Sequence, residues 1–300
     1  MAGLTTFHEK LIAYRVWEFV ACLAVTGAIF ALTASSVYRR PIPHLVIPLD
    51  ASTTIFARDP SLDLKKEKEQ VPLDVAIAIF YATPLVVHTI VQWLRYVRND
   101  SRDFLLTLFI SSAVCQLLTH FAKAMTGRFR PCFYDMCKWD TTVIWDGVTN
   151  LCRDPKGEAE GRKSFPSGHA SSAFSTLFLL TLYLLGRSKL LSASSLATRR
   201  GFVASAAFFV AFAPTMVAMW IAITRSQDNW HHYSDILAGS VIGICSAILG
   251  YSVNYGSLFD YKTAGMPLET LEELKQSELP TYNHAFRRHE SGTASPSTLP

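Results

Sequence analysis

Long apolar stretches constrain the fold of this chain more than any other feature. Four of them are long enough to cross a bilayer, since a spanning helix needs about 20 predominantly apolar residues. They occupy residues 17–37, 73–94, 104–122 and 202–223. Only 17% of the 300 residues are charged, whereas a typical soluble domain has roughly a quarter. The sequence therefore predicts an integral membrane protein.

Two shorter apolar stretches, residues 170–185 and 236–253, are rich in Gly, Ala and Ser. Small residues let membrane helices pack closely, so we count both as spans; the alternative is two buried helices of a soluble domain. The predicted fold is an all-α membrane protein with six transmembrane helices. Its parts are a cytoplasmic N-terminus (1–16), a six-span catalytic domain (17–255) and a cytoplasmic, partly disordered tail (256–300). We interpret the first span as an anchor, because it lacks a small-residue cleavage site.

Three polar segments lie outside the spans and the motifs. The charged run at residues 65–69 is predicted to be a solvated face. Residues 268–279 are predicted to form a short amphipathic helix. From residue 290 the chain is rich in Ser, Thr, Pro and Gly, a composition typical of disorder.

Three polar motifs stand at the ends of the spans. They are KAMTGRFRP at residues 123–131, PSGH at 166–169 and TRSQDNWHHYSD at 224–235. Counting the crossings puts all three on the same side of the membrane, whichever way the protein is inserted.

The charges of the short loops predict the orientation. Short cytoplasmic loops are enriched in Lys and Arg, and the two short loops on the side of both termini carry Arg95, Arg98, Arg102, Arg187, Lys189, Arg199 and Arg200. We therefore expect cytoplasmic termini and motifs on the lumenal or extracellular side. An oxidising compartment there would permit one disulfide among Cys132, Cys137 and Cys152, in a pairing that the sequence leaves open.

The motifs hold three cations that suit a phosphate group. Transfer of a phosphoryl group spreads negative charge over its oxygens, and without a metal several cations must stabilise it. Lys123, Arg130 and Arg225 are the candidates, because Arg offers a fork of donors and Lys a point charge. The alternative is that each anchors a span end at the lipid headgroups.

Two histidines complete the candidate site. The PSGH motif opens a helix whose free N–H groups suit an anion, with Ser167 as a further donor and His169 beside it. His231 and Asp235 are four residues apart, which on a helix places them on one face. A carboxylate on one ring nitrogen leaves the other free to attack. His232 is predicted to point to another face, at the membrane interface.

The ordered pattern K-x6-RP, PSGH and R-x5-H-x3-D resembles the phosphatidic acid phosphatase type 2 superfamily. It is most similar to the lipid phosphate phosphatase branch, which includes fungal diacylglycerol pyrophosphate phosphatases. The resemblance covers roughly residues 17–253, and Thr224 stands where that family usually has Ser. It implies a six-helix fold and metal-independent hydrolysis of lipid phosphates such as phosphatidate, lysophosphatidate or diacylglycerol pyrophosphate.

The resemblance also implies a role for each residue. His231 would be the nucleophile that forms a phosphohistidine, held by Asp235, and His169 would protonate the leaving group and then activate water. The phosphate would be held by Lys123, Arg130, Ser167, Gly168 and Arg225. No cofactor, metal or nucleic acid is expected; the partners are the lipid substrate and the bilayer, with a homo-oligomer left open. The membrane would be an endomembrane (vacuole, Golgi or endoplasmic reticulum) or the plasma membrane.

Three alternatives come from other classes. One is a phosphotransferase of the same architecture that acts on sphingolipid or polyprenyl (pyro)phosphates. Another is a non-catalytic membrane relative, which should have lost a histidine or a cation, and none is missing here. The third is a soluble vanadate haloperoxidase with the same anion pocket, which the apolar spans argue against.

Overall fold

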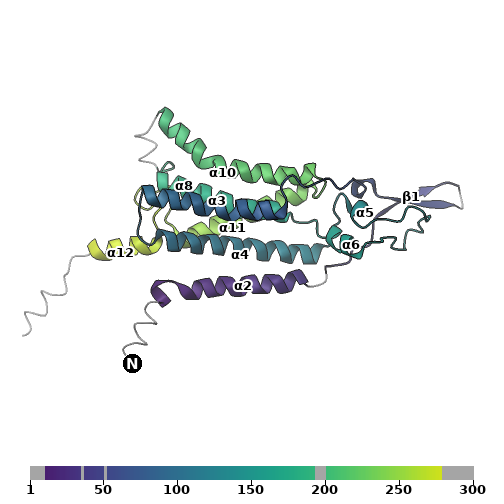
Figure 1. Ribbon diagram of the computed structural model, residues 1–300, viewed down its shortest axis with the longest axis horizontal. Helices are drawn as coiled ribbons and strands as arrows, with labels where there is room; N and C mark the ends of the chain where they lie inside the picture. Colours follow the sequence, from purple (N-terminus) through teal and green to yellow (C-terminus); the bar gives the residue numbers. More distant parts are fainter. Residues whose placement is uncertain (1–10, 35–36, 51–52, 193–200, 279–300) are drawn as a thin grey trace, which may run out of the picture.

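The computed structural model describes residues 11–34, 37–50, 53–192 and 201–278. Within these ranges, five helices are long and apolar enough to cross a membrane (Figure 1). They are α3 (Leu73–Leu94), α4 (Asp100–Thr126), the continuous segment Gly168–Ser188, α10 (Phe202–Gln227) and α11 (Tyr233–Asn254). Five of the six predicted spans are thus present as membrane-length helices.

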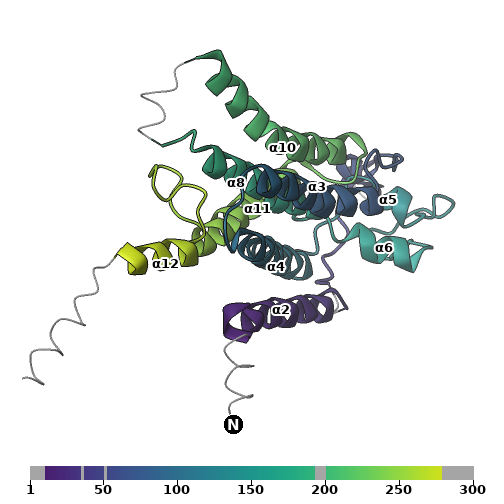
Figure 2. The ribbon, with the colours of Figure 1, turned by 60° about the vertical axis from the view of Figure 1, so that its left-hand side comes forward.

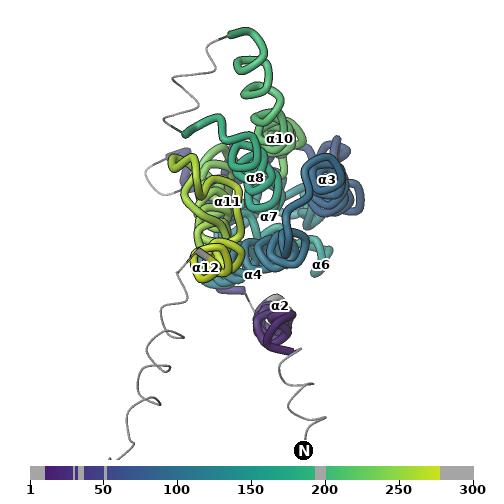
Figure 3. The backbone as a smooth tube through the Cα atoms, turned by 90° about the vertical axis from the view of Figure 1, so that its left-hand side faces the viewer, coloured from purple at the N-terminus to yellow at the C-terminus, as the bar shows by residue number. Residues whose placement is uncertain are grey.

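The segment Gly168–Ser188 is the centre of the bundle. It consists of α7 (Gly168–Ala173), one π-helical turn, η2 (Phe174–Phe178), and α8 (Leu179–Ser188). Seen end-on, it lies among α3, α4, α10 and α11 (Figure 3). Most of it is buried in the protein, whereas α3 and α10 expose most of their apolar side chains at the bundle surface. The PSGH motif therefore opens the helix that is best shielded from lipid.

Small residues join α11 to this central helix. A Cβ atom at Gly239 would lie 2.5 Å from the carbonyl oxygen of Ser167, and one at Gly243 would clash with the carbonyl of Ser171. The two backbones are therefore in direct contact, as the small-residue pattern predicts. This contact brings the start of α7 against the start of α11, where the second and third motifs lie.

Gly127 ends α4 within the first motif. Its φ of 54° lies in the left-handed region that glycine adopts without cost, and a Cβ there would clash with the carbonyl oxygen of Tyr38. The helix therefore stops at Thr126, one turn after Lys123, and the chain continues into the loop that carries Arg130.

The first apolar stretch forms α2 (Val16–Ala34), which packs on the outside of α4 (Figure 3). Its described apolar part, Val16–Ile29, is shorter than a full span. At its start Arg15 donates to Asp103 (3.0 Å) and to Asn254 (2.7 Å), which ties α2 to the beginning of α4 and the end of α11.

The all-α prediction is wrong for the segment before α3. Strands β1 (His44–Pro48) and β2 (Thr54–Arg58) pair as an antiparallel hairpin that projects beyond the end of the bundle (Figure 1). Both strands contain β-branched residues, which favour extended backbone. The short helices η1 (Pro60–Leu62), α5 (Phe133–Met136) and α6 (Pro155–Gly161) lie at the same end. Together they form a small cap over the motifs.

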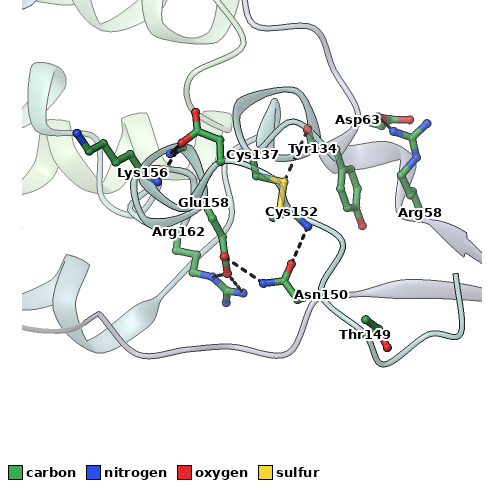
Figure 4. The surroundings of a disulfide bond; sticks show 12 residues. Arg58, Asp63, Tyr134, Cys137, Thr149, Asn150, Cys152, Lys156, Glu158 and Arg162 are labelled. Atoms are coloured by element: carbon green, nitrogen blue, oxygen red, sulfur yellow. Dashed lines mark hydrogen bonds and ion pairs between the residues drawn. A yellow bond between two sulfur atoms is a disulfide. The ribbon is translucent and has the colours of Figure 1, made fainter. Parts of the chain in front are cut away.

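A disulfide between Cys137 and Cys152 closes the loop that links α5 to α6 (Figure 4). The expected single bridge is therefore present, and Cys132 is the cysteine of this loop that stays free and buried. Burial raises the pKa of the Cys132 thiol to about 11, so it stays protonated at neutral pH.

The C-terminal segment folds back on the opposite end of the bundle (Figure 2). Tyr255 pairs with Pro267, and α12 (Leu268–Glu278) follows, where the sequence predicts the amphipathic helix. There Arg102 of α4 forms an ion pair with Glu269. The tail predicted to be disordered, from residue 290, lies outside the described residues.

Candidate active site

A cavity of about 640 Å³ opens where the three motifs meet. Six of the eight predicted site residues line it: Lys123, Arg130, Gly168, His169, Arg225 and His231. The other two, Ser167 and Asp235, are fully buried directly behind this wall. The three motifs thus meet at one end of the bundle, as expected if all three share one side of the membrane.

Arg225 is completely buried near the end of α10. Its Nη1 donates to Glu69 Oε2 (2.8 Å) and its Nη2 to Asp228 Oδ2 (2.7 Å). Within the described part of the chain, its Nε makes no hydrogen bond. Two carboxylates therefore fix the plane of the guanidinium and leave donor capacity at the cavity.

Arg130 reaches the cavity from the loop after α4. Its Nη2 donates to Glu160 Oε1 (2.6 Å), its Nη1 to the Trp230 carbonyl (3.2 Å), and its guanidinium lies 4.7 Å from the centre of the Trp230 ring. Burial lowers the pKa of Arg130, yet an arginine remains charged at neutral pH. Lys123 completes the trio, with its Nζ donating to the Lys163 carbonyl (3.0 Å).

The start of α7 forms the next wall. Ser167 is the N-cap, and its Oγ accepts from the Ala170 N–H at 3.5 Å, a long bond. The first N–H groups of a helix have no partner inside it, so those of Gly168 and His169 can donate to an anion. The His169 Nε2 is buried and makes no hydrogen bond within the described residues.

The contacts of His231 indicate which of its nitrogens carries the proton. Its Nε2 lies 3.2 Å from Arg130 Nη1, and arginine has donors only, so Nε2 must be the acceptor. Burial, followed by the charge of Arg130, lowers the pKa of His231 well below its usual range. The ring is therefore neutral at pH 7, with its proton on Nδ1 and a lone pair on Nε2.

Asp235 stands behind His231, although not as the sequence predicts. Helix α11 begins at Tyr233, so His231 precedes the helix, and its Nδ1 is 3.7 Å from Asp235 Oδ2. That distance is longer than a hydrogen bond, and with the ring neutral the contact becomes an ion pair only when the ring gains a positive charge. The two side chains are thus neighbours as predicted, but the prediction that both stand on one helix is wrong. His232 is the helix N-cap, its backbone N–H donates to Asp235 Oδ2 (3.1 Å), and its ring Nδ1 lies 3.3 Å from the same oxygen. The prediction that the His232 ring points away from this carboxylate is therefore wrong, whereas its position at the membrane interface stays a prediction.

Asp235 has two further partners that sequence reasoning missed. Arg128 donates to its Oδ1 (2.7 Å), and Ser164 donates to its Oδ2 (2.6 Å). Arg128 belongs to the first motif, TGRFRP, so its position there was a usable signal. Ser164 stands two residues before the PSGH motif, and no feature of the sequence marked it as a partner of Asp235.

Three carboxylates near the cations were missed as well. Glu69 lies in the charged run that was predicted to be solvated, but it pairs with buried Arg225. Asp228 pairs with the same arginine, and Glu160 with Arg130. A solvated charge run and an ion pair with a distant motif look alike in sequence, because the partner is set by tertiary packing.

Comparison with known proteins agrees with this geometry. The family model of the PAP2 superfamily matches residues 104–258. The chain belongs to the PAP2 superfamily. It is therefore a multi-pass membrane protein of a largely helical family, in agreement with its apolar helices.

Several curated PAP2 relatives are similar to the chain. Lipid phosphate phosphatase 2 of Arabidopsis thaliana is 33% identical over 60% of this chain and 63% of its own length. Probable diacylglycerol pyrophosphate phosphatase 1 of Schizosaccharomyces pombe is 33% identical over 51% of this chain and 55% of its own length. Phospholipid phosphatase 2 of Rattus norvegicus is 34% identical over 61% of this chain and 65% of its own length. The chain thus spans about half to two thirds of these relatives. No solved structure matches it significantly.

Proposed function

We propose that the chain is a lipid phosphate phosphatase that removes the terminal phosphate of phosphatidate, lysophosphatidate or diacylglycerol pyrophosphate. The observation that carries this proposal is the cavity in which three cations meet the imidazoles of His169 and His231, with that of His120 also in the lining, at the end of a membrane bundle. The names of the related phosphatases support the same substrate class.

Phosphate binding is the first step of the proposed mechanism. The phosphate oxygens would accept hydrogen bonds from Lys123, Arg130 and Arg225 and from the N–H groups at the start of α7. The two arginines are held in place before substrate arrives, by Glu69, Asp228 and Glu160. Preorganised donors of this kind stabilise the charge that develops in the transition state.

Attack on phosphorus is the second step. The Nε2 lone pair of His231 forms the N–P bond while the bond from phosphorus to the lipid oxygen breaks, which gives a phosphohistidine. Positive charge then develops on the ring, and the Asp235 carboxylate near Nδ1 stabilises it. Arg128 and Ser164 hold that carboxylate in position.

His169 would serve both halves of the reaction. It gives a proton to the departing lipid oxygen and then takes one from the water that cleaves the phosphohistidine. Its Nε2, which makes no hydrogen bond within the described residues, is available for these transfers.

We also propose that α2 is a sixth span and that the cavity faces the lumen or the cell exterior. The disulfide at the cavity end supports this side, because disulfides persist in oxidising compartments. Cysteine reporters near residues 140 and 291 should then react from opposite sides of the membrane. Labelling of both on sealed cells by an impermeant reagent would contradict the topology.

The decisive experiment is phosphate release from a panel of lipid phosphates by purified protein in detergent, with EDTA present. We expect release of inorganic phosphate to persist in EDTA, because side chains supply the positive charge. Loss of turnover in EDTA that magnesium restores would contradict metal independence. Transfer of phosphate to a lipid hydroxyl in place of water would favour a phosphotransferase.

A further inference from the structure

The cavity extends from the phosphate-binding cations toward the membrane interior, and its two walls differ. One wall is α4, where Gln116, His120 and Lys123 all line the cavity. Their spacing of four and three residues places them on one face of the helix. Helix α3 contributes Leu73, Ile77, Phe80 and Tyr81, a mostly apolar wall in which the Tyr81 hydroxyl is the one polar group.

The polar groups on the α4 wall have hydrogen-bonding capacity to spare. Gln116 Nε2 donates to Ser172 Oγ (2.8 Å), which uses one of the two donors of the amide. His120 is half-buried and makes no side-chain hydrogen bond within the described part of the chain. A polar side chain at membrane depth is costly unless it is paired, and such residues usually serve a function.

The depth of His120 and Gln116 along α4 matches the depth at which the backbone of a bound lipid would lie. With a rise of about 1.5 Å per residue, His120 lies about 4.5 Å and Gln116 about 10 Å below Lys123 along α4. A phosphate held by Lys123 would place the carbons next to it, and any oxygens on them, at this level.

We propose that His120 and Gln116 form a specificity subsite for the oxygens of a glycerolipid backbone. The subsite rests on the proposed phosphatase function and deepens it. It favours substrates with ester or hydroxyl oxygens beside the phosphate, such as phosphatidate, over those whose phosphate is joined directly to hydrocarbon. The mostly apolar α3 wall contacts the hydrocarbon chains in either case.

The test compares diacyl phosphatidate with hexadecyl phosphate, which lacks backbone oxygens, in the same detergent micelles. His120→Leu should lower kcat/KM for phosphatidate about 10-fold, the effect of one lost hydrogen bond, and leave hexadecyl phosphate within about 2-fold. Gln116→Leu should act in the same direction, and His120→Gln, which keeps a donor, should recover most of the loss. His88→Leu removes an imidazole from α3 far from the cavity and should change neither rate.

The outcomes separate the two proposals. Equal losses on both substrates in His120→Leu and Gln116→Leu would overturn the subsite while the phosphatase function stands. Wild-type protein that does not prefer phosphatidate would do the same. Failure of the wild type to release phosphate from either lipid would overturn the proposed function itself.

Discussion

The two ends of the helical bundle both bury charged groups, but they differ in the space beside those groups. The motif end gathers arginine, lysine and histidine around a cavity of about 640 Å³. The opposite end buries two carboxylates, Asp100 and Asp103, among donors that enclose them. Both ends pair their charges with partners from the protein, but the motif end has a cavity beside its cations, whereas the donors at the opposite end enclose the two carboxylates.

Unpaired polar atoms do not distinguish the two ends. Within the described residues, buried atoms without a hydrogen bond occur at the motif end in His169, Arg225, Trp230 and His231. They occur toward the opposite end in His88, Arg187, Tyr251 and Asn254. The cavity, with residues of all three motifs in its lining, is therefore the feature that identifies the site.

The largest expected effect is that of His231→Ala. If His231 attacks phosphorus, its loss should lower turnover on every substrate by on the order of 10⁴-fold or more, since a nucleophile acts in both steps. The measurement is phosphate release from phosphatidate and from an aryl phosphate. An aryl phosphatase activity that persists in this variant would show that another group attacks.

The sequence predicted the motif end well because its determinants are local. Each motif sits next to an apolar span, so the spans themselves bring Lys123, His169 and Arg225 to one end. The hairpin and the partners of the cations were missed, since Glu69 and Glu160 reach their arginines through tertiary packing that leaves no periodic signal.

His169→Ala should have a smaller and substrate-dependent effect. General acid catalysis contributes about 100- to 10,000-fold when the leaving group is an alkoxide. A nitrophenolate leaves unaided, so the loss should be far greater on phosphatidate than on nitrophenyl phosphate. The aryl substrate should also trap an acid-labile phosphoenzyme, because water activation is impaired. Equal losses on both substrates would mean that His169 is not the acid.

Arg225→Lys should have the next largest effect on activity, a loss on the order of 100-fold in kcat/KM. The charge is kept, but the planar fork held by Glu69 and Asp228 is lost. Arg102→Lys at the opposite end is the matched control and should leave the rate unchanged. A near wild-type rate for Arg225→Lys would reduce Arg225 to an anchor at the membrane interface.

The opposite end was less predictable from sequence. Asp100 and Asp103 stand at the start of α4, where acidic residues are common because they favour the helix N-terminus. The burial of Asp100 depends on Tyr183 and Tyr255, which come from other parts of the chain. Helix packing decides such contacts, and one sequence does not reveal it.

The smallest expected effect on the rate is that of Asp100→Asn, which tests whether the two ends are independent. The carboxylate of Asp100 accepts from the hydroxyls of Tyr183 (2.7 Å) and Tyr255 (2.8 Å) while fully buried. Hydrogen bonds to a charged group are stronger than those to a neutral one, so the amide should lower stability by about 2 kcal/mol. Turnover per folded molecule should stay within about 2-fold, because Asp100 lies at the far end of α4 from the cavity.

The measurements are thermal unfolding in detergent and kcat on an aryl phosphate, with Tyr255→Phe as a variant that removes one of the two bonds. A large fall in kcat with unchanged unfolding would mean that the end with Asp100 controls the motif end. The division between a structural and a catalytic end would then be wrong.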